Sequence, residues 1–404
     1  MIPFSPPRID QQIIDEVTAA LTSGWITTGP RTKLFEKKIT EYCGNKSTVA
    51  LNSATAGLEL ILRWFGVGEG DEVIIPAYTY CATANVVIHC GATPVFVDVN
   101  ASDFNISVEA IEKAITSKTK VIMPVDFAGL PCDYEVINTL VKRNDFSKIF
   151  TAKTEEQRIL GRILVLSDAA HSFGAISNGK VCGSLTDVSV FSFHAVKNLT
   201  TAEGGAIALN LPEPFDNDEL YKKLCITSLH GQNKDALAKT QKGNWKYDVI
   251  EAGYKCNMTD LSAAIGLIEI ERYKSETLVK RKYIFDAYKK GLSVFDWAEI
   301  PVYETNEKVS SYHLFPLRIK GINELQRDQI IQRIFDEDVS VNVHFIPVPK
   351  LSFYSNMGYT IENYPTTLDN YSREISLPVF YDLTDEQIQR VINAVIKAVK
   401  SVVA

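Results

Sequence analysis

The sequence predicts an α/β protein in which a mostly parallel sheet lies between layers of helices. Between about residues 49 and 210, short β-rich runs alternate with helical patterns, as in wound α/β structures. The chain has 404 residues and is 46% hydrophobic, which is enough to bury a large core. After the long helical stretch that follows residue 260, the composition shifts to mixed strands and helices. We therefore expect a large domain over residues 1–265 and a smaller α+β domain over residues 266–404.

The first helix that contributes to the expected sheet layers lies in NSATAGLELILRWFG. Four apolar residues recur at helical spacing and form one face: Leu58, Ile61, Leu62 and Phe65. Ser53 or Thr55 would cap its start. GVGEGD, residues 66–71, follows this helix and precedes a strand, so it indicates a helix end and a turn rather than a dinucleotide-binding loop.

The predicted strands are EVIIPAY, TPVFVDV, KVIMPVDFA, RILVLSDAA, VSVFSFH and GGAIAL. A polar interval over residues 144–157 interrupts their alternation and predicts a surface insertion, and a second polar loop is expected at about residues 232–246. The end of the chain predicts a helix with one apolar face, formed by Ile388, Val391, Ile392, Val395, Ile396 and Val399.

The charge and cysteine content exclude several classes of protein. Lys plus Arg number 42 and Asp plus Glu number 49, and the net charge of −7 argues against sequence-independent binding to nucleic acid or to an anionic membrane. The chain starts without a signal-peptide pattern, and it has no apolar run of about 18 residues, so we expect a cytoplasmic protein. Seven cysteines without a C-x-x-C pair indicate buried thiols rather than disulfides or a metal site.

Four segments at strand ends or helix starts carry candidate chemistry, because open α/β sheets bind ligands there. NSATAGL, residues 52–58, brings small and hydroxyl residues to a helix N-terminus, which suits a phosphate, although an ordinary helix cap has the same pattern. PAYTYCATAN, residues 76–85, places Tyr78 and Tyr80 where a strand gives way to a helix. One of these rings could cover a planar cofactor, or both could pack at the layer edge.

The third segment, LSDAAHSFGA, carries an acid at the end of an apolar strand. Burying Asp168 is costly without a partner, and a protonated ring nitrogen would be suitable; a helix-capping role is the alternative. His171 could share a helical face with Asp168 if a helix begins there, or it could be structural.

The fourth segment, FSFHAVKNLTTAEGG, places Ser192 and Lys197 after a predicted buried strand. By itself Lys197 would be a surface lysine. Together, the four segments supply phosphate donors, an aromatic ring, a buried acid and an amine, which are the groups that pyridoxal phosphate needs. TTAEGG is expected to turn the backbone sharply, so that the amine of Lys197 faces the pocket.

The residues that carry these features resemble the DegT/DnrJ/EryC1/StrS family of sugar aminotransferases, which are fold-type I pyridoxal phosphate enzymes. The similarity covers nearly the whole chain and includes SGWITTGPRTKLFEKKITEYCG, NSATAGLEL, GDEVIIPAYTYCATAN, SDAAHSFGA, FSFHAVKNLTTAEGGAIAL, GYKCNMTDLSAAIGL, SYHLFPLRI and REISLPVFYDLTDEQ. FSFHAVKN and SATAGL are especially similar to the branch that aminates UDP-linked 4-keto pentoses.

The resemblance implies a role for each matching residue. Lys197 would form the Schiff base with the cofactor, Asp168 would contact its pyridinium nitrogen, and His171 would lie near its phenolic oxygen. The other implied cofactor-binding residues are Tyr80 over the ring, Ser192, Thr55 and Ala56 at the phosphate, and Asn257 at the phosphate of a neighbouring subunit. The role of Asn257 implies a homodimer with shared active sites.

Some positions depart from the family pattern or vary within it. Ser167 stands where many relatives have glutamate, and Ala54 replaces a common glycine. His313 and His344 match positions in a region that varies with substrate.

The implied activity is a ping-pong transamination from L-glutamate to a nucleotide-linked keto sugar, for polysaccharide or other glycan biosynthesis. Lys197 would be the general base and acid for the proton shift. A related dehydratase is one alternative, but such relatives commonly replace this lysine with histidine. A non-catalytic regulator that binds a sugar nucleotide is another. The resemblance predicts neither the keto sugar nor amination at C3 or C4.

Overall fold

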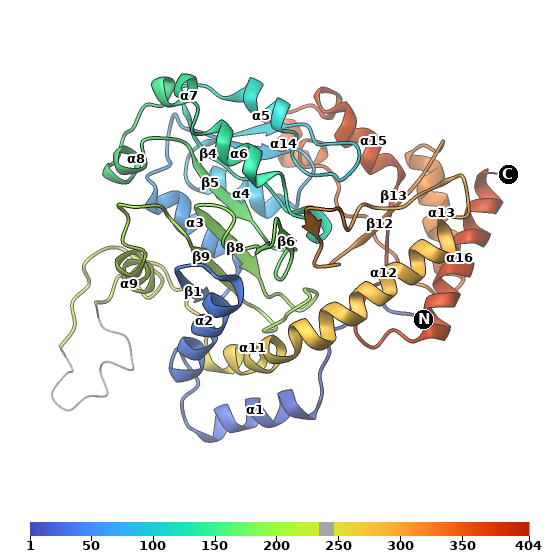
Figure 1. Cartoon of the computed structure of the whole chain (residues 1–404), viewed down its shortest axis with the longest axis horizontal. Helices are drawn as coiled ribbons and strands as arrows, with labels where there is room; N and C mark the ends of the chain where they lie inside the picture. The colour runs from blue at the N-terminus through green and yellow to red at the C-terminus, as the bar shows by residue number, and fades with distance from the viewer. Residues whose placement is uncertain (234–245, 404) are drawn as a thin grey trace.

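A computed structural model describes residues 1–233 and 246–403 (Figure 1). Within these residues the main sheet has seven strands, in the spatial order β1 (Ser47–Leu51), β9 (Gly205–Leu209), β8 (Val188–Ser192), β5 (Leu164–Asp168), β4 (Thr119–Ile122), β2 (Glu72–Pro76) and β3 (Thr93–Val97). All the pairs from β8 to β3 are parallel, and β9 runs antiparallel to both of its neighbours. The predicted α/β architecture with a mostly parallel sheet is confirmed.

Each of the six predicted runs contains a strand of this sheet. The strand β1, with the sequence STVAL, was not among them. It is short, all five of its residues are buried, and it pairs with β9 at the edge of the sheet. A five-residue run of this kind has too little periodicity to be distinguished from the helix pattern that follows it.

Side chains alternate between the two faces of the central strands, so each face carries its own apolar core. Val121 of β4 and Leu164 of β5 belong to a cluster with the helix side chains Leu58 and Ile61. Ile122 of β4 lies in the opposite cluster. Helices therefore cover both faces of the sheet, as parallel sheets require (Figure 1).

The helices of the sheet-containing part include α1 (Gln11–Thr22), α2 (Pro30–Cys43), α3 (Ala54–Trp64), α4 (Cys81–His89), α5 (Val108–Ala114), α6 (Tyr134–Leu140), α9 (Asn217–Thr227) and α11 (Asp260–Arg272). The predicted apolar face of α3 is buried. Of the two candidate caps, Ser53 is the one used, because its hydroxyl accepts the N–H of Ala56 at 3.2 Å. Gly66 and Gly70 then turn the chain with positive φ angles, as GVGEGD predicts.

The polar interval over residues 144–157 is not simply a surface loop. It contains α7 (Asn144–Ile149) and the start of α8 (Glu155–Leu160). Most of its side chains are exposed or half-buried, but Gln157 is fully buried and donates its amide hydrogen to the carbonyl of Phe65 at 2.8 Å. One buried side chain therefore anchors the insertion to the end of α3. Most of the second expected loop, residues 232–246, lies outside the described residues.

The C-terminal part has its own sheet and core. The strands β10 (Ala298–Glu299), β12 (Phe315–Ile319) and β13 (Glu374–Leu377) form an antiparallel sheet with β12 in the middle. Its helices are α12 (Leu278–Leu292), α13 (Glu324–Asp336), α14 (Ser352–Asn356), α15 (Pro365–Arg373) and α16 (Asp385–Val403). The predicted face of α16 packs into this core, with only Ile396 half-buried.

A long helical segment connects the two parts (Figure 1). The helix α11 packs beside α1 and α2, continues through a π turn at Tyr273–Thr277, and becomes α12, which packs on α16. A short sheet of β6 (Ile176–Ser177), β7 (Lys180–Val181) and β11 (Lys308–Val309) joins segments from both parts. The domain boundary expected at residues 265 and 266 falls within α11 and stays a prediction.

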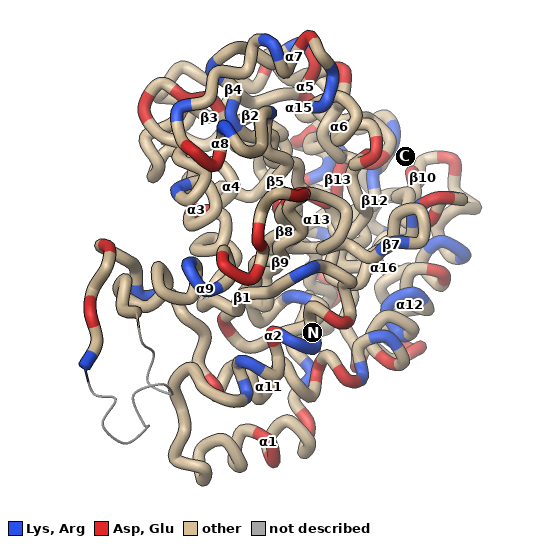
Figure 2. Tube along the Cα trace, turned by 60° about the vertical axis from the view of Figure 1, so that its left-hand side comes forward, with Lys and Arg blue, Asp and Glu red and all other residues tan. Residues whose placement is uncertain are grey.

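Acidic and basic residues are mixed over the whole trace (Figure 2), in keeping with the small net charge. Among the described residues, no helix is long and apolar enough to cross a bilayer. The seven cysteines are free thiols, four buried and three half-buried.

Candidate active site

A cavity of about 340 Å³ opens beside the ends of β5 and β8 and the starts of α3 and α4. This is the edge at which open α/β sheets bind ligands. Six of the eight predicted site residues line it: Thr55, Tyr80, Asp168, His171, Ser192 and Lys197. The other two, Ala56 and Asn257, do not contribute to its wall.

The N-terminus of α3 forms one end of the cavity. Ser53, Ala54 and Thr55 line it there, and the N–H groups of a first helical turn carry partial positive charge that suits an anion. A Cβ on Gly205 would lie 2.4 Å from the amide nitrogen of Ala54, so the start of β9 passes against the helix start where only glycine fits. The N–H of Ala56 is used by the Ser53 cap. Ala56 therefore lies behind the N-terminal end of α3 that lines the cavity, and not in the cavity wall.

Asp168 is the last residue of β5 and is only 6% exposed. Its Oδ2 accepts the hydroxyl hydrogen of Thr83 at 2.8 Å, and its Oδ1 accepts the N–H of Ala170 at 3.3 Å. Burial raises the pKa of this carboxyl, while these hydrogen bonds and the nearby charge of Lys197 act against the increase. A buried carboxyl at the cavity wall is suited to hold a cation of the ligand.

No helix begins at Asp168, so both the helix-capping alternative and the shared helical face with His171 are wrong. The N–H groups of Asp168 and Ala169 remain bonded to the neighbouring strands, at Pro124 and Val190. The sheet pairing therefore continues through Asp168, and turns follow it. These turns bring His171 to the cavity.

His171 is buried beside a second histidine. Its ring centroid lies 4.4 Å from that of His313 and 5.8 Å from that of Phe345. Burial, together with the positive charge of Lys197, holds the pKa of His171 well below its ordinary value. Within the described part of the chain, Nδ1 of His171 is a buried atom without a hydrogen-bond partner. A neutral imidazole with an unused nitrogen is available for a polar group of a ligand.

Lys197 lies in the loop after β8 and lines the cavity. The backbone N–H of Lys197 donates to the carbonyl of His194 at 2.9 Å. Burial lowers the pKa of its amine to about 8, although the Asp168 carboxylate acts to raise it. A substantial fraction of this amine is thus neutral and nucleophilic at mildly alkaline pH. The predicted sharp turn follows, with Ala202 at φ 67°.

The two candidate tyrosines have different environments. Tyr80 precedes α4, is 58% exposed, lines the cavity and lies 5.6 Å from the ring of Phe345. Tyr78 is fully buried and donates its hydroxyl hydrogen to the carbonyl of His344 at 2.7 Å. The structure thus places Tyr80 where a ring could cover a ligand, and Tyr78 in the packed layer.

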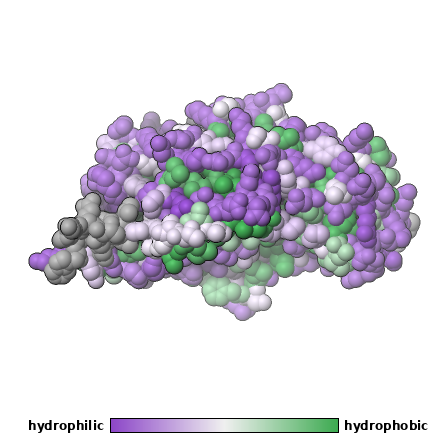
Figure 3. Space-filling view, turned by 90° about the horizontal axis from the view of Figure 1, so that it is seen from below, coloured by the Kyte–Doolittle hydropathy of each residue, from purple (hydrophilic) through white to green (hydrophobic). Residues whose placement is uncertain are grey.

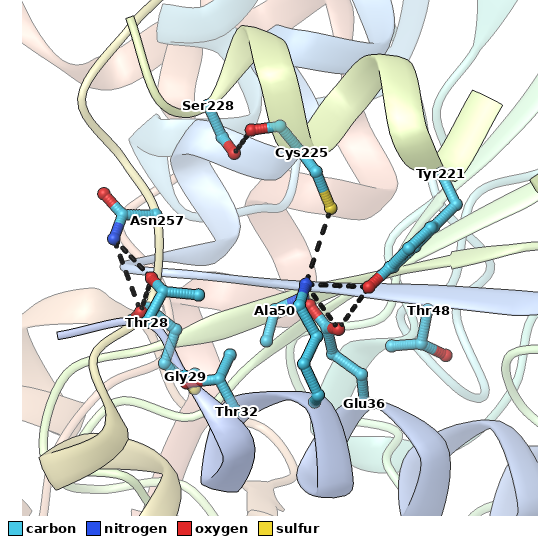
Figure 4. Close-up of polar contacts among 12 residues, drawn as sticks. Thr28, Gly29, Thr32, Glu36, Thr48, Ala50, Tyr221, Cys225, Ser228 and Asn257 are labelled. Carbon is cyan, nitrogen blue, oxygen red and sulfur yellow. Dashed lines mark hydrogen bonds and ion pairs between the residues drawn. The ribbon is translucent and has the colours of Figure 1, made fainter. Parts of the chain in front are cut away.

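Asn257 lies beyond the edge of the sheet, where it pairs with Leu51 through a β-bridge. Figure 4 shows its amide pointing towards Thr28, to whose hydroxyl oxygen it donates at 2.5 Å. The same view includes Glu36 and Tyr221, which together bind the ammonium of Lys33 between α2 and α9. That ion pair is separate from the cavity wall.

Sequence reasoning missed two groups of residues at the site. Thr83 was not assigned, although it lies on the first turn of α4, three residues after Tyr80. Phe4 and Phe345 line the cavity from segments that no motif distinguishes. His313 and His344 also line it, as their family positions suggest.

A family model matches residues 7–154 and 156–396 of this chain, and its description is "DegT/DnrJ/EryC1/StrS aminotransferase family". The chain belongs to this family. "Uncharacterized protein MJ1066" from Methanocaldococcus jannaschii is 38% identical over 98% of this chain and 97% of its own length. "Spore coat polysaccharide biosynthesis protein SpsC" from Bacillus subtilis is 35% identical over 99% of this chain and 97% of its own.

Solved structures of this aminotransferase family have the same fold. "Putative sugar aminotransferase Spr1654 from Streptococcus pneumoniae" is similar in its PMP-form, with 44% identity, a TM-score of 0.96 and full coverage of both chains. Its PLP-form gives 43% identity and a TM-score of 0.94, again with full coverage of both chains.

One departure from the family pattern has a structural explanation. The hydroxyl of Ser167 lies 2.6 Å from that of Tyr134, which donates to the carboxyl of Asp126 at 2.6 Å. Asp126 is fully buried and also accepts from Ser172 at 2.6 Å. In this family member, therefore, a short polar residue at position 167 joins a buried network that already contains a carboxyl group.

Proposed function

We propose that this protein is a pyridoxal phosphate-dependent sugar aminotransferase. The observation that carries the proposal is that the cavity holds both a lysine amine with a lowered pKa and a buried carboxyl. The first group suits imine formation with the aldehyde of the cofactor, and the second suits its ring nitrogen. The printed names of the Streptococcus pneumoniae structures support the same activity.

The residues of the cavity fit the cofactor. The glycine-lined start of β9 leaves room at the N-terminus of α3 for a phosphate. The unpartnered Nδ1 of His171 offers a hydrogen bond to the phenolic oxygen. Ser192 and Thr55 add hydroxyl groups at the phosphate end, and Tyr80 adds an exposed ring.

In the proposed mechanism, the cofactor supplies an electron sink for the carbanion at the reacting carbon. Asp168 would hold the ring nitrogen of the cofactor, and its ionised form would favour protonation of that nitrogen. Thr83 fixes Oδ2 of Asp168, so the carboxylate is held in one orientation. Lys197 would act as the general base that takes the proton from the donor's α-carbon, and then as the general acid that returns it to the carbon of the cofactor's aldehyde group.

We further propose L-glutamate as the donor and a nucleotide-linked keto sugar as the acceptor, in the biosynthesis of a polysaccharide or another glycan. The name of the Bacillus subtilis relative supports this context. The similarity of FSFHAVKN and SATAGL to the UDP-4-keto-pentose branch favours a 4-keto pentose. Retention of Lys197 favours transamination over the dehydratase alternative.

We also propose that the enzyme is a homodimer in which Asn257 reaches the phosphate of the neighbouring subunit. Asn257 lies outside the cavity of its own chain. Large apolar side chains are exposed on and after α1, at Ile14, Leu21 and Ile26, and in the segment of residues 247–250. Figure 3 shows apolar areas among hydrophilic ones on the face seen from below. A dimer would bury such residues.

Borohydride reduction and peptide mapping test the central claim. Reduction of the purified yellow protein is expected to attach the cofactor to Lys197 only, and attachment at another lysine would refute the assignment. Lys197→Ala is the control that should lose the covalent label. Glutamate should bleach the imine absorbance, which a non-catalytic binder would not show. A panel of 3-keto and 4-keto nucleotide sugars, with the amine and dehydration products measured separately, then distinguishes transferase from dehydratase.

A further inference from the structure

His344 is held at the cavity wall by nearly all of its polar groups. Its backbone N–H donates to Oε2 of Glu374 at 3.0 Å, and its backbone carbonyl accepts the hydroxyl hydrogen of Tyr78 at 2.7 Å. Its Nδ1 lies 2.9 Å from the hydroxyl of Ser376. Phe4 stacks on the ring at 5.3 Å, and Phe345 meets it edge-on at 5.1 Å. Among the described residues, Nε2 has no hydrogen-bond partner, so it is the nitrogen left for a ligand.

Ser376 connects this ring to a buried carboxyl group. Glu374 and Ser376 are two residues apart on β13 and therefore point to the same face of the sheet. The Ser376 hydroxyl lies 2.5 Å from Oε1 of Glu374, whose side chain is completely buried. His344, Ser376 and Glu374 thus form one continuous chain of hydrogen bonds that leads from the cavity into the protein.

Among the described residues, the carboxyl of Glu374 forms no salt bridge, although the charges of Arg327 and Arg318 act to lower its pKa. Arg327 donates to the backbone carbonyl of Glu374 at 3.3 Å, and its own side chain pairs with Asp328 at 2.7 Å. Arg318 pairs with Glu299. The hydroxyl of Tyr78 is bonded to His344, and the Tyr371 hydroxyl is bonded to Glu324. In the part of the chain that the structure describes, His344 and Ser376 are therefore the hydrogen-bond partners of this carboxyl.

The direction of the hydrogen-bond chain depends on one proton. When Glu374 is ionised, its Oε1 accepts the proton of Ser376, so the Ser376 oxygen accepts from Nδ1–H and Nε2 is left bare. When Glu374 is protonated, it donates to Ser376, Ser376 donates to Nδ1, and Nε2 carries the hydrogen. The ring is neutral in both states, because burial lowers the pKa of His344 to about 3. Burial raises the pKa of Glu374 to about 8, so both states are accessible.

We propose that Glu374 acts through Ser376 to set the tautomer of His344, a residue of the cavity wall, and so decides whether Nε2 donates or accepts a hydrogen bond. Glu374 and Ser376 are positioning residues. Near neutral pH, Nε2–H is presented and suits an oxygen acceptor on the substrate, such as a keto oxygen or a hydroxyl oxygen. This last step rests on the proposed function, whereas the tautomer itself does not.

The tautomer can be measured directly in the full-length holoenzyme. Long-range ¹H–¹⁵N correlation spectra of ¹⁵N-histidine-labelled protein distinguish Nδ1–H from Nε2–H, and the chain has only six histidines. His344→Asn identifies the signal of His344. In the wild type, we expect Nε2–H at about pH 6 and Nδ1–H at about pH 9.5, on the two sides of the raised carboxyl pKa. A wild-type tautomer that does not change with pH would overturn the proposal.

Two variants and one control complete the test. Glu374→Gln places an amide donor next to the hydroxyl of Ser376, so His344 should stay in the Nε2–H tautomer at both pH values. Ser376→Ala should abolish the pH-dependent change, and it carries the test if Glu374→Gln does not fold. Ser372→Ala is the matched control, because its hydroxyl binds the carbonyl of Leu368 instead, and it should behave as the wild type. A pH-dependent tautomer in Glu374→Gln would also overturn the proposal.

Single-turnover kinetics then connect the tautomer to substrate recognition. The quantity to measure is the rate constant for the half-reaction with the keto sugar, divided by the keto-sugar concentration that gives half of the maximal rate. In the wild type it should be about tenfold lower at about pH 9.5 than at about pH 6. The Glu374→Gln variant should lack this decrease. Absence of any reaction with keto sugars would refute the proposed substrate while leaving the spectroscopic result intact. A confirmed tautomer change with equal pH profiles in both proteins would overturn the role in recognition.

Discussion

Thr83 donates its hydroxyl hydrogen to Oδ2 of Asp168 at 2.8 Å, across the base of the cavity. Thr83 lies on the first turn of α4 and Asp168 ends β5, so a helix start and a strand end meet at this contact. The hydrogen bond lowers the pKa of a carboxyl that burial raises. Thr83 therefore favours the ionised form of Asp168, which the proposed contact with a protonated ring nitrogen requires.

Replacing Thr83 by valine should weaken cofactor binding. The variant keeps the shape of the side chain but removes the donor, and a hydrogen bond to a charged group contributes about 1.5–3 kcal/mol. We expect the dissociation constant of pyridoxal phosphate to rise at least about tenfold. Absorbance titration of the cofactor-free protein measures it. Thr83→Ser retains the hydroxyl and should restore binding; equal affinities for all three proteins would contradict the assignment.

The amine of Lys197 should react at unusually low pH in the cofactor-free protein. Burial lowers its pKa to about 8 from 10.5, so the neutral form and the labelling rate should rise with a midpoint near pH 8. An amine-specific reagent and mass spectrometry of the Lys197 peptide measure this rate. Lys222, whose pKa Glu219 raises, is the internal control and should react only at higher pH.

Asp168→Asn extends this experiment. The Asp168 carboxylate raises the pKa of Lys197, so the variant should move the labelling midpoint below that of the wild type. A midpoint that moves upwards would mean that the two groups do not interact as the structure indicates.

The close approach of β9 to α3 predicts the effect of a single methyl group. Gly205→Ala would place a Cβ 2.4 Å from the nitrogen of Ala54 and 2.8 Å from the carbonyl oxygen of Phe191, and neither backbone atom can move easily. Overpacking of this kind costs about 1–3 kcal/mol of unfolding free energy or more. It should also weaken cofactor binding, because it would displace the start of α3, where we propose that the phosphate binds.

Gly68→Ala is the control for this substitution. Its new Cβ would meet only the carbonyl oxygen of Cys90, at an ordinary 3.8 Å. Urea unfolding and cofactor titration of both variants test the difference. If Gly205→Ala were as stable as Gly68→Ala, the contact between β9 and α3 would not be close enough to require glycine.

The sequence predicts the main sheet well because its strands are buried, rich in β-branched residues and separated by helices. It predicts α3 and α16 for a similar reason, since each has a sustained apolar face. A helix start at Asp168, which the sequence left open as an alternative, is absent because hydrogen bonds to two neighbouring strands hold the backbone extended. Local sequence does not show whether a segment will pair with strands that are distant in the chain instead of starting a helix. Likewise, one buried glutamine anchors the polar interval 144–157, and composition does not distinguish it from its exposed neighbours.

The sequence also predicts only some of the residues that form the cavity. The residues that motifs identify, such as Lys197 and Asp168, lie where short segments end at the edge of the sheet. Glu374 and Ser376 share a face because they are two residues apart on β13, a strand that the sequence analysis did not assign. Their connection to His344 depends on how the C-terminal sheet packs against the segment of residues 342–345, and no sequence pattern contains that information.

Mixed dimers test whether Asn257 acts in the neighbouring active site. Lys197→Ala removes the amine, and Asn257→Asp places a negative charge that should repel a phosphate. Each variant alone should be nearly inactive. In a heterodimer of the two, one active site carries both defects and the other carries neither, so coexpression should restore activity. If Asn257 acted within its own chain, each site would carry one defect and no activity would return.

The buried carboxyl of Glu374 should make stability depend on pH in a particular direction. Its pKa is raised from 4.5 in the unfolded chain to about 8 in the folded protein, so folding favours the protonated form. The wild type therefore loses stability as pH rises through this window, by at most about 1.4 kcal/mol per pH unit. Glu374→Gln cannot ionise, so its unfolding free energy relative to the wild type should rise between pH 4.5 and 8 and level off above. Urea unfolding across this range measures the difference, with the exposed Glu362→Gln as a control for the loss of one charge. If the unfolding free energy of Glu374→Gln relative to the wild type fell as pH rises, a cation would be stabilising the carboxylate of Glu374. Glu374 would then not be protonated near neutral pH, and it could not set the tautomer of His344 by gaining or losing a proton.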